Sequence, residues 1–188
     1  MYSILLKTES IADKLQSYMN ELSFKWKGSE NTSDYEEQKP KVYAFTFDDL
    51  AGNTPLHTPS VLVQVINLDS NGIAKFVVYC CVCNPAQQGK EMTNPVQGED
   101  NVYQYSDSDS IDTSFVRSEL YRYALMLGEQ VYLAIKKMGN KDESISDVSL
   151  IPPSPYMEKF PYCECSVTFD CRLDTTPARI DTDVWKYL

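Results

Sequence analysis

The spacing of apolar residues predicts two helices. Near the N-terminus, apolar residues recur at helical spacing between Lys, Asp, Gln and Asn, which predicts an amphipathic helix over residues 3–22. A stronger pattern begins at the N-cap candidates Asp112, Thr113 and Ser114 and stops at Gly139. At about 1.5 Å per residue, about 25 helical residues form a rod of roughly 37 Å, which is long enough to cross a sheet.

Alternating or continuous apolar runs predict the strands. Residues 41–47 and 60–68 each form such a run, and a third strand is expected at 162–173. The sequence DSNG at 69–72 is a tight-turn signal, so the strand at 73–83 should be a hairpin partner. That strand is apolar on both faces. This favours a central position with the long helix on one face and the other helix, or a neighbouring subunit, on the other.

Polar segments rich in Pro, Gly, Asp or Ser separate these elements. Loops are predicted over 27–40 and 48–59. Residues 147–161 are predicted to form a short strand that runs into a proline-rich bend. The connection at 84–112 is long for a compact domain, and such loops are usually disordered or functional. The tail at 174–188 lacks a clear period but ends in large apolar residues, which usually dock on a surface.

The order of these elements is helix, three strands, long loop, long helix, one or two strands, and tail. It predicts a single α+β domain over residues 1–188. The sheet is expected to be mostly antiparallel, to have four to five strands, and to pack against the N-terminal helix and the long central helix. A chain of 188 residues with 43% hydrophobic and 23% charged residues can bury one such core.

The chain is acidic, with a formal net charge of −10. It would repel a phosphate backbone, so specific nucleic-acid binding is not expected, although DNA could slide through an acidic channel without sticking. The N-terminus lacks the basic region of a signal peptide, and no run approaches about 18 apolar residues. No membrane partner is therefore expected, and the predicted setting is the cytoplasm, where thiols stay reduced.

The six cysteines form two groups: Cys80, Cys81 and Cys83, and Cys163, Cys165 and Cys171. The second group falls on the apolar face of an alternating strand, and the first lies in the strand that is apolar on both faces. Because free cysteine behaves as a small hydrophobe, this pattern favours core positions. Structural zinc sites usually place C-x₂₋₄-C at a turn, which C-C-x-C within a strand does not match. A cross-strand disulfide is geometrically open but rare in the cytoplasm.

Few other residues suggest chemistry. The only histidine, His57, has no nucleophile marked near it, and no glycine-rich phosphate loop is present. Asp107, Asp109 and Asp112 lie close together but lack the Gly and Glu of an EF-hand loop, which favours an acidic loop over a metal site. We therefore predict no catalytic, cofactor-binding or metal-binding residues, and a protein that is not an enzyme.

Four segments carry a resemblance to a known family. They are IADKLQSYM, TPSVLVQVIN, SFVRSELYRYALMLGEQVYLAI and SLIPPSPYMEKFPYCECSVTF, which together span about residues 3–172. In this pattern the chain resembles the tail-terminator, or tail-completion, proteins of tailed bacteriophages. These form a ring that closes the head-proximal end of the tail tube and joins it to the neck. The resemblance implies a virion structural protein made in the host cytoplasm, a hexameric ring, and tail-tube and neck proteins as partners.

The acidic connection at 84–112 and the tail at 174–188 are longer than a minimal member of that family needs. In this interpretation they are arms between subunits. The candidate interface residues are Asp107, Asp109, Asp112, Trp185, Tyr187 and Leu188. Three alternatives stay open: another neck or connector protein of the same virion region, a cysteine-dependent metal or redox protein, and a small cytoplasmic binding or chaperone module.

Overall fold

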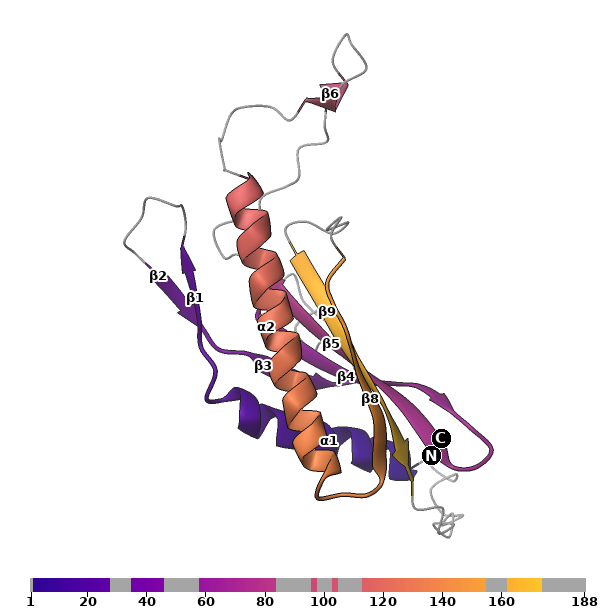
Figure 1. Ribbon diagram of the computed structural model, residues 1–188. Helices are drawn as coiled ribbons and strands as arrows, with labels where there is room; N and C mark the ends of the chain where they lie inside the picture. The colour runs from indigo at the N-terminus through magenta and orange to yellow at the C-terminus, as the bar shows by residue number, and fades with distance from the viewer. Residues whose placement is uncertain are drawn as a thin grey trace, which may run out of the picture.

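The computed structural model describes residues 2–27, 35–45, 58–83, 96–97, 103–104, 113–154 and 162–173. In this part of the chain, a five-stranded sheet of order β3-β4-β5-β9-β8 packs against two helices (Figure 1). All neighbouring strands are antiparallel except β3 and β4, which are parallel. The predicted α+β fold, with a mostly antiparallel sheet and two helices, is confirmed.

The elements have the following bounds: α1 Tyr2–Met19, β1 Phe24–Lys27, β2 Tyr35–Gln38, β3 Lys41–Ala44, β4 Ser60–Leu68, β5 Ile73–Cys83, β6 Val96–Gln97, β7 Tyr103–Gln104, α2 Thr113–Gly139, β8 Ile145–Ile151 and β9 Tyr162–Arg172.

Helix α1 buries one face. Ile11, Leu15 and Met19 recur every four residues, so they share one side of the helix, and all three are buried. The helix ends at Met19, three residues before the predicted end. There the N–H of Leu22 donates to the carbonyl of Met19 over 3.0 Å and closes a turn.

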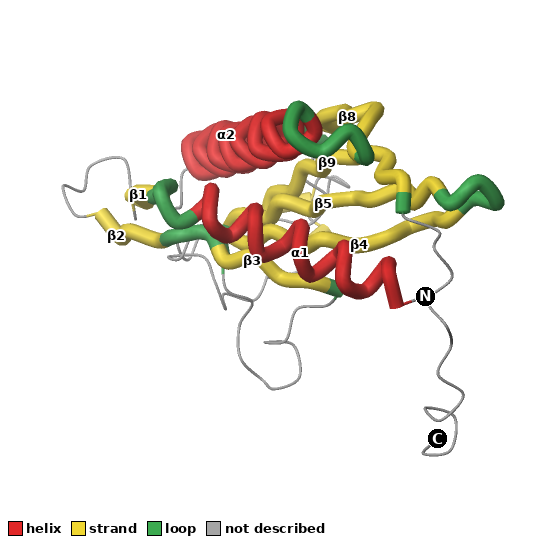
Figure 2. Tube along the Cα trace, turned by 90° about the horizontal axis from the view of Figure 1, so that it is seen from below, coloured by secondary structure: helices red, strands yellow, loops and turns green. Residues whose placement is uncertain are grey.

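Helix α2 is the longest element and crosses over the sheet. Its buried side includes Leu120, Leu127, Val131 and Ile135. It runs to Gly139, as predicted, with Lys136 and Lys137 in the last turn, where cations favour the helix dipole. Figure 2 shows α2 alongside β8 and β9, and α1 alongside β3 and β4. The two helices therefore divide the width of the sheet between them.

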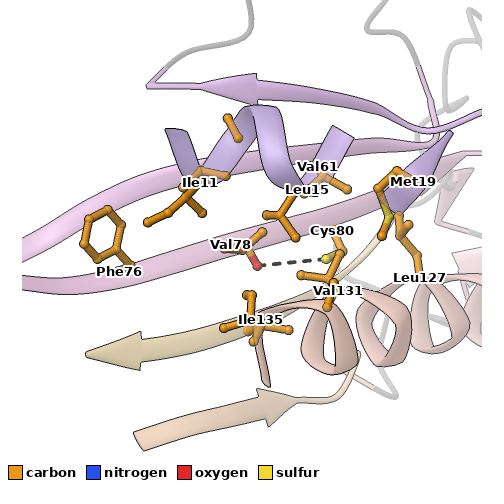
Figure 3. Packing of buried hydrophobic residues seen from close by; sticks show 14 of the residues in the cluster. Ile11, Leu15, Met19, Val61, Phe76, Val78, Cys80, Leu127, Val131 and Ile135 are labelled. Carbon is orange, nitrogen blue, oxygen red and sulfur yellow. Dashed lines mark hydrogen bonds between the residues drawn. The ribbon is translucent and has the colours of Figure 1, made fainter. Parts of the chain in front are cut away.

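Both helices lie on the same face of the sheet. One hydrophobic core contains Leu15 from α1, Val131 from α2 and Val78 from β5 (Figure 3). Of the two predicted covers for the other face of β5, the second helix is therefore wrong, and a neighbouring subunit stays a prediction. Apolar residues on both faces of a strand indicate burial, but they do not indicate which element provides it. We call the side opposite the helices the second face; neither helix packs on it.

Strand β5 is central, as predicted, between β4 and β9. The predicted hairpin turn precedes it. There the Asp69 carboxylate accepts the N–H groups of Asn71 (2.9 Å) and Ile73 (2.8 Å), while Gly72 takes a φ of 76° that suits glycine. Against β9, the rings of Phe76 and Phe169 stack with centroids 5.1 Å apart. These contacts fix the register of the sheet.

The hairpin of β1 and β2 was not predicted, because residues 27–40 were expected to be a loop. These short strands pair only with each other and project beside α2 (Figure 1). Phe24 is buried and meets the Tyr123 ring edge-on at 5.5 Å, and the Tyr123 hydroxyl donates to the Lys25 carbonyl over 2.6 Å. Strand β2, YEEQ, shows no apolar alternation and β1 has only four residues, which explains the wrong prediction.

Other boundaries differ slightly from the predictions. The strand expected at 41–47 ends at Ala44, because Phe45 has a φ of 69°. Strand β8 begins two residues before the range 147–161 that was expected to contain it. The connection at 84–112 includes the short pair β6 and β7, and its other residues lie outside the described residues.

Candidate functional surface

The sheet register places one residue from each strand in a row across the second face. The row is Tyr43, Leu62, Tyr79, Ser166 and Ile151, from β3, β4, β5, β9 and β8. The first four each lie between residues that form the helix-covered core or pack against it, and Ile151 follows Leu150, which packs against that core. Strand alternation therefore directs the row away from the helices. We call these five residues the transverse row.

The transverse row is buried at one end and exposed at the other. Tyr43 and Leu62 are only 4% and 6% exposed, whereas Tyr79 is 36% and Ile151 is 50% exposed. Ser166, between them, is half-buried. The exposed end thus combines an aromatic ring with a polar tip, a hydroxyl and a branched aliphatic side chain, a composition common at protein interfaces.

The neighbouring rows are mixed in character. Val77 is buried on β5 and pairs with the half-buried Thr168 of β9. One step further along, Lys75 pairs with Asp170, so opposite charges face each other across the strands. The second face therefore presents a small apolar centre bounded by polar residues instead of a continuous apolar surface.

The edge strand β3 is held by α1. The Gln16 side chain accepts the N–H of Val42 (2.8 Å) and donates to the carbonyl of Pro40 (3.3 Å). Among the described strands β3 pairs only with β4, so this amide supplies contacts that a further strand would have made. On the second face, the Lys41 ammonium lies 4.7 Å from the Tyr43 ring centroid. The buried end of the row is thus rigidly placed.

The turn before the other edge strand, β8, is held by an ion pair. The Lys7 ammonium lies 2.8 Å from the Asp142 carboxylate and donates to Ser144 over 3.2 Å. The hydrogen bond from Lys7, followed by one from Ser144, lowers the pKa of Asp142 well below its usual value. This pair connects α1 to the segment that leads from α2 into β8.

All six cysteines are buried, in agreement with the core interpretation. Burial raises the pKa of Cys83 to about 12 and that of Cys163 to about 11. A hydrogen bond with Cys165, together with burial, also raises the pKa of Cys80. These thiols are neutral near pH 7, unlike the thiolates of reactive cysteines. Among the residues that the structure describes, no group of three or more His, Cys, Asp or Glu side chains is arranged to hold a metal ion.

The candidate interface residues from the sequence cannot be placed. Asp107, Asp109, Asp112, Trp185, Tyr187 and Leu188 all lie outside the described residues, as does His57. Sequence reasoning put Tyr79 on one face of a doubly apolar strand but did not single it out, and it missed Ile151. Their exposure depends on which face the helices cover, and alternation within a strand does not carry that information.

No protein-family model, curated protein or solved structure matches the chain. None of the helices in the described ranges is long and apolar enough to cross a membrane.

Proposed function

We propose that this protein is a non-enzymatic virion structural subunit, which assembles with copies of itself into a ring of the tail-terminator type. One observation carries the proposal: both helices cover the same face of the sheet, and the opposite face exposes Tyr79 and Ile151. Exposed apolar residues that lie on an ordered sheet, bounded by polar residues, are typical of a protein contact.

The order of elements supports the proposal. The segment IADKLQSYM lies in α1, SVLVQVIN in β4, and the long apolar segment in α2, while YCECSVTF begins β9. All four segments that carry the resemblance therefore contribute to one core. The agreement concerns the pattern of elements, and it leaves a neck or connector role in the same virion region as an outcome of the test below.

The rigidity of the second face also supports it. Strands β5 and β9 pair without a register shift from Ile73 and Arg172 to Cys83 and Tyr162. Gln16 and Lys7 fix the edge strand β3 and the turn before β8. A surface that is already ordered loses little entropy on association, so a modest patch can contribute to a stable contact. In the proposed ring the transverse row contacts a neighbouring copy, and the negative net charge keeps passing DNA from binding.

Negative-stain electron microscopy of the purified chain, alone and mixed with tail tubes, tests this function. Rings that cap one end of the tube are expected. Rings that bind a head connector but not tubes would assign the protein to another neck position. If only monomers are seen in the presence of tubes, the proposal is wrong.

A further inference from the structure

The seam between the two halves of the sheet contains two cysteines in direct register. Strand β5 ends the first run of strands, and β9 belongs to the final pair, so the contact of β5 with β9 joins distant parts of the chain. Cys80 pairs with Cys165 near the middle of this contact. Both residues face the helices, with exposed fractions of 0% and 4%.

Geometry allows these two residues to form a bond. Opposed residues of an antiparallel pair have Cα atoms about 4.5 or 5.5 Å apart, depending on the site type. Disulfides require about 4.4–6.8 Å, so either site type satisfies the backbone requirement. Both side chains also belong to the same buried core cluster, on the face that the helices cover.

The other cysteines lack an opposed thiol. Their register partners are Ser60 and Glu164 for Cys81, Tyr162 for Cys83, Val82 for Cys163, and Ala74 and Ile145 for Cys171. Diagonal neighbours in a sheet are about 7–8 Å apart, beyond the usual disulfide range. Adjacent residues such as Cys80 and Cys81 point to opposite faces. Six cysteines allow about 15 different pairs, and the native fold therefore favours one of them, Cys80 with Cys165.

We infer that Cys80 and Cys165 are a latent disulfide, formed when the chain folds in the presence of a disulfide oxidant such as glutathione disulfide. The Cys80 thiolate attacks the oxidant, forming a mixed disulfide and releasing one glutathione thiolate. The Cys165 thiolate then attacks the Cys80 sulfur and releases the second glutathione. Two protein thiols lose two electrons and two protons, and the oxidant becomes two glutathione molecules. This inference does not depend on ring assembly.

The surroundings explain why the bond would lock the fold. The Cys165 thiol donates to the Ala124 carbonyl of α2 over 3.0 Å, and Gly128 leaves room for its sulfur. In the folded chain both thiols are buried, so an oxidant in solution reaches them only slowly. Once formed, the bond would covalently join β5 to β9 and restrict the unfolded chain, which raises stability.

Refolding tests the inference without requiring access to the folded core. The reduced, unfolded full chain is refolded in a buffer of reduced and oxidised glutathione, then alkylated and mapped by peptide mass spectrometry. We expect four alkylated cysteines and one disulfide between residues 80 and 165, and a higher urea midpoint than in the reduced protein. Cys165→Ala should abolish the disulfide, whereas Cys171→Ala, another buried cysteine on the same strand, should retain it. Refolded protein with six free thiols, or with mixed pairings, would overturn the inference.

Discussion

The two faces of the sheet are built from alternate residues of the same strands, yet they differ in what covers them. On the helix-covered face, α1 and α2 enclose Phe76, Phe169 and the Cys80–Cys165 pair. On the second face, the transverse row is buried at Tyr43 and exposed at Tyr79 and Ile151. The difference indicates that the helix-covered face contributes most of the burial, while the second face combines a buried end with exposed apolar residues.

The largest expected contrast separates Phe76 from Tyr79, which lie on the same strand but on opposite faces. Phe76→Ala removes a fully buried ring and should lower the free energy of unfolding by about 3–5 kcal/mol. Tyr79→Ala should lower it by only about 0.5 kcal/mol, as for other exposed positions. Urea denaturation of both variants measures this difference. Equal losses would show that the two faces contribute equally to stability.

Alkaline unfolding compares a buried thiol on each face, Cys83 on the second face and Cys163 on the helix-covered face. Both have a pKa raised from 9.0, to about 12 and about 11, so the folded state keeps protons that the unfolded state loses. Their contribution is fully present below pH 9 and is lost progressively as the pH rises from 9 through the folded values. Relative to a pH below 9, each thiol should lower the free energy of unfolding at pH 10 by about 1.4 kcal/mol, and the two together by about 3 kcal/mol.

Urea denaturation at pH 8 and pH 10 measures this loss. Cys83→Ala and Cys163→Ala should each remove about 1.4 kcal/mol of the pH-dependent loss, whatever their effect at pH 8. If Cys83→Ala leaves the loss unchanged, its side of the sheet is open to water at that end.

Gly128 tests how closely the helix layer packs on the sheet. A methyl group at this position would overlap the Cys165 sulfur and come within 3.0 Å of Leu150. Overpacking of this kind costs about 1–3 kcal/mol, against a gain of about 1 kcal/mol in helix propensity, so Gly128→Ala should be destabilising by about 1 kcal/mol. Thermal or urea unfolding gives the value.

A double-mutant cycle isolates the cause. In a Cys165→Ala background, Gly128→Ala should lose most of its cost, because the overlapping sulfur is absent. Gly139→Ala is the matched control, since its methyl group would meet ordinary contacts at 3.5 Å. If Gly128→Ala is as destabilising in the Cys165→Ala background as in the wild-type chain, the proposed packing is contradicted.

The smallest effect concerns Lys7, which connects the helix layer to the turn before β8. Its ion pair is partly exposed, so Lys7→Met should lower stability by about 0.5 kcal/mol at pH 6. Because the folded pKa of Asp142 is lowered from 3.8, the stabilisation is present above that value and is lost as the pH falls. The difference between the two proteins should therefore shrink progressively as the pH falls below 3.8, in acid and urea titrations. A difference that is independent of pH would indicate lost packing in place of lost charge.

Much of the helix-covered face was predictable from the sequence. Periodicity located both helices, and alternation placed Cys163, Cys165 and Cys171 on a single buried face, because burial on one side leaves a period of two. The DSNG turn fixed the partner of β5 because its geometry is local. These signals depend on neighbouring residues in the chain.

The second face was not predictable in the same way. Tyr79 and Ile151 become neighbours across Ser166 only after β9 inserts between β5 and β8, and nothing local encodes that order. The β1–β2 hairpin was missed because β2, YEEQ, shows no apolar alternation and β1 has only four residues. The predicted interface residues lie outside the described residues, so that part of the prediction stays a prediction.

The most direct test of the proposed assembly is the solution mass measured by light scattering. The wild-type chain should form a ring whose mass is a multiple of 21.4 kDa, and Tyr79→Asp combined with Ile151→Asp should reduce it to the monomer. Leu133→Asp is the matched control, because Leu133 is 55% exposed but lies on the other layer, in α2, and this variant should keep the wild-type mass. A wild-type mass of 21.4 kDa at every concentration, or a ring that survives the double substitution, would contradict the account.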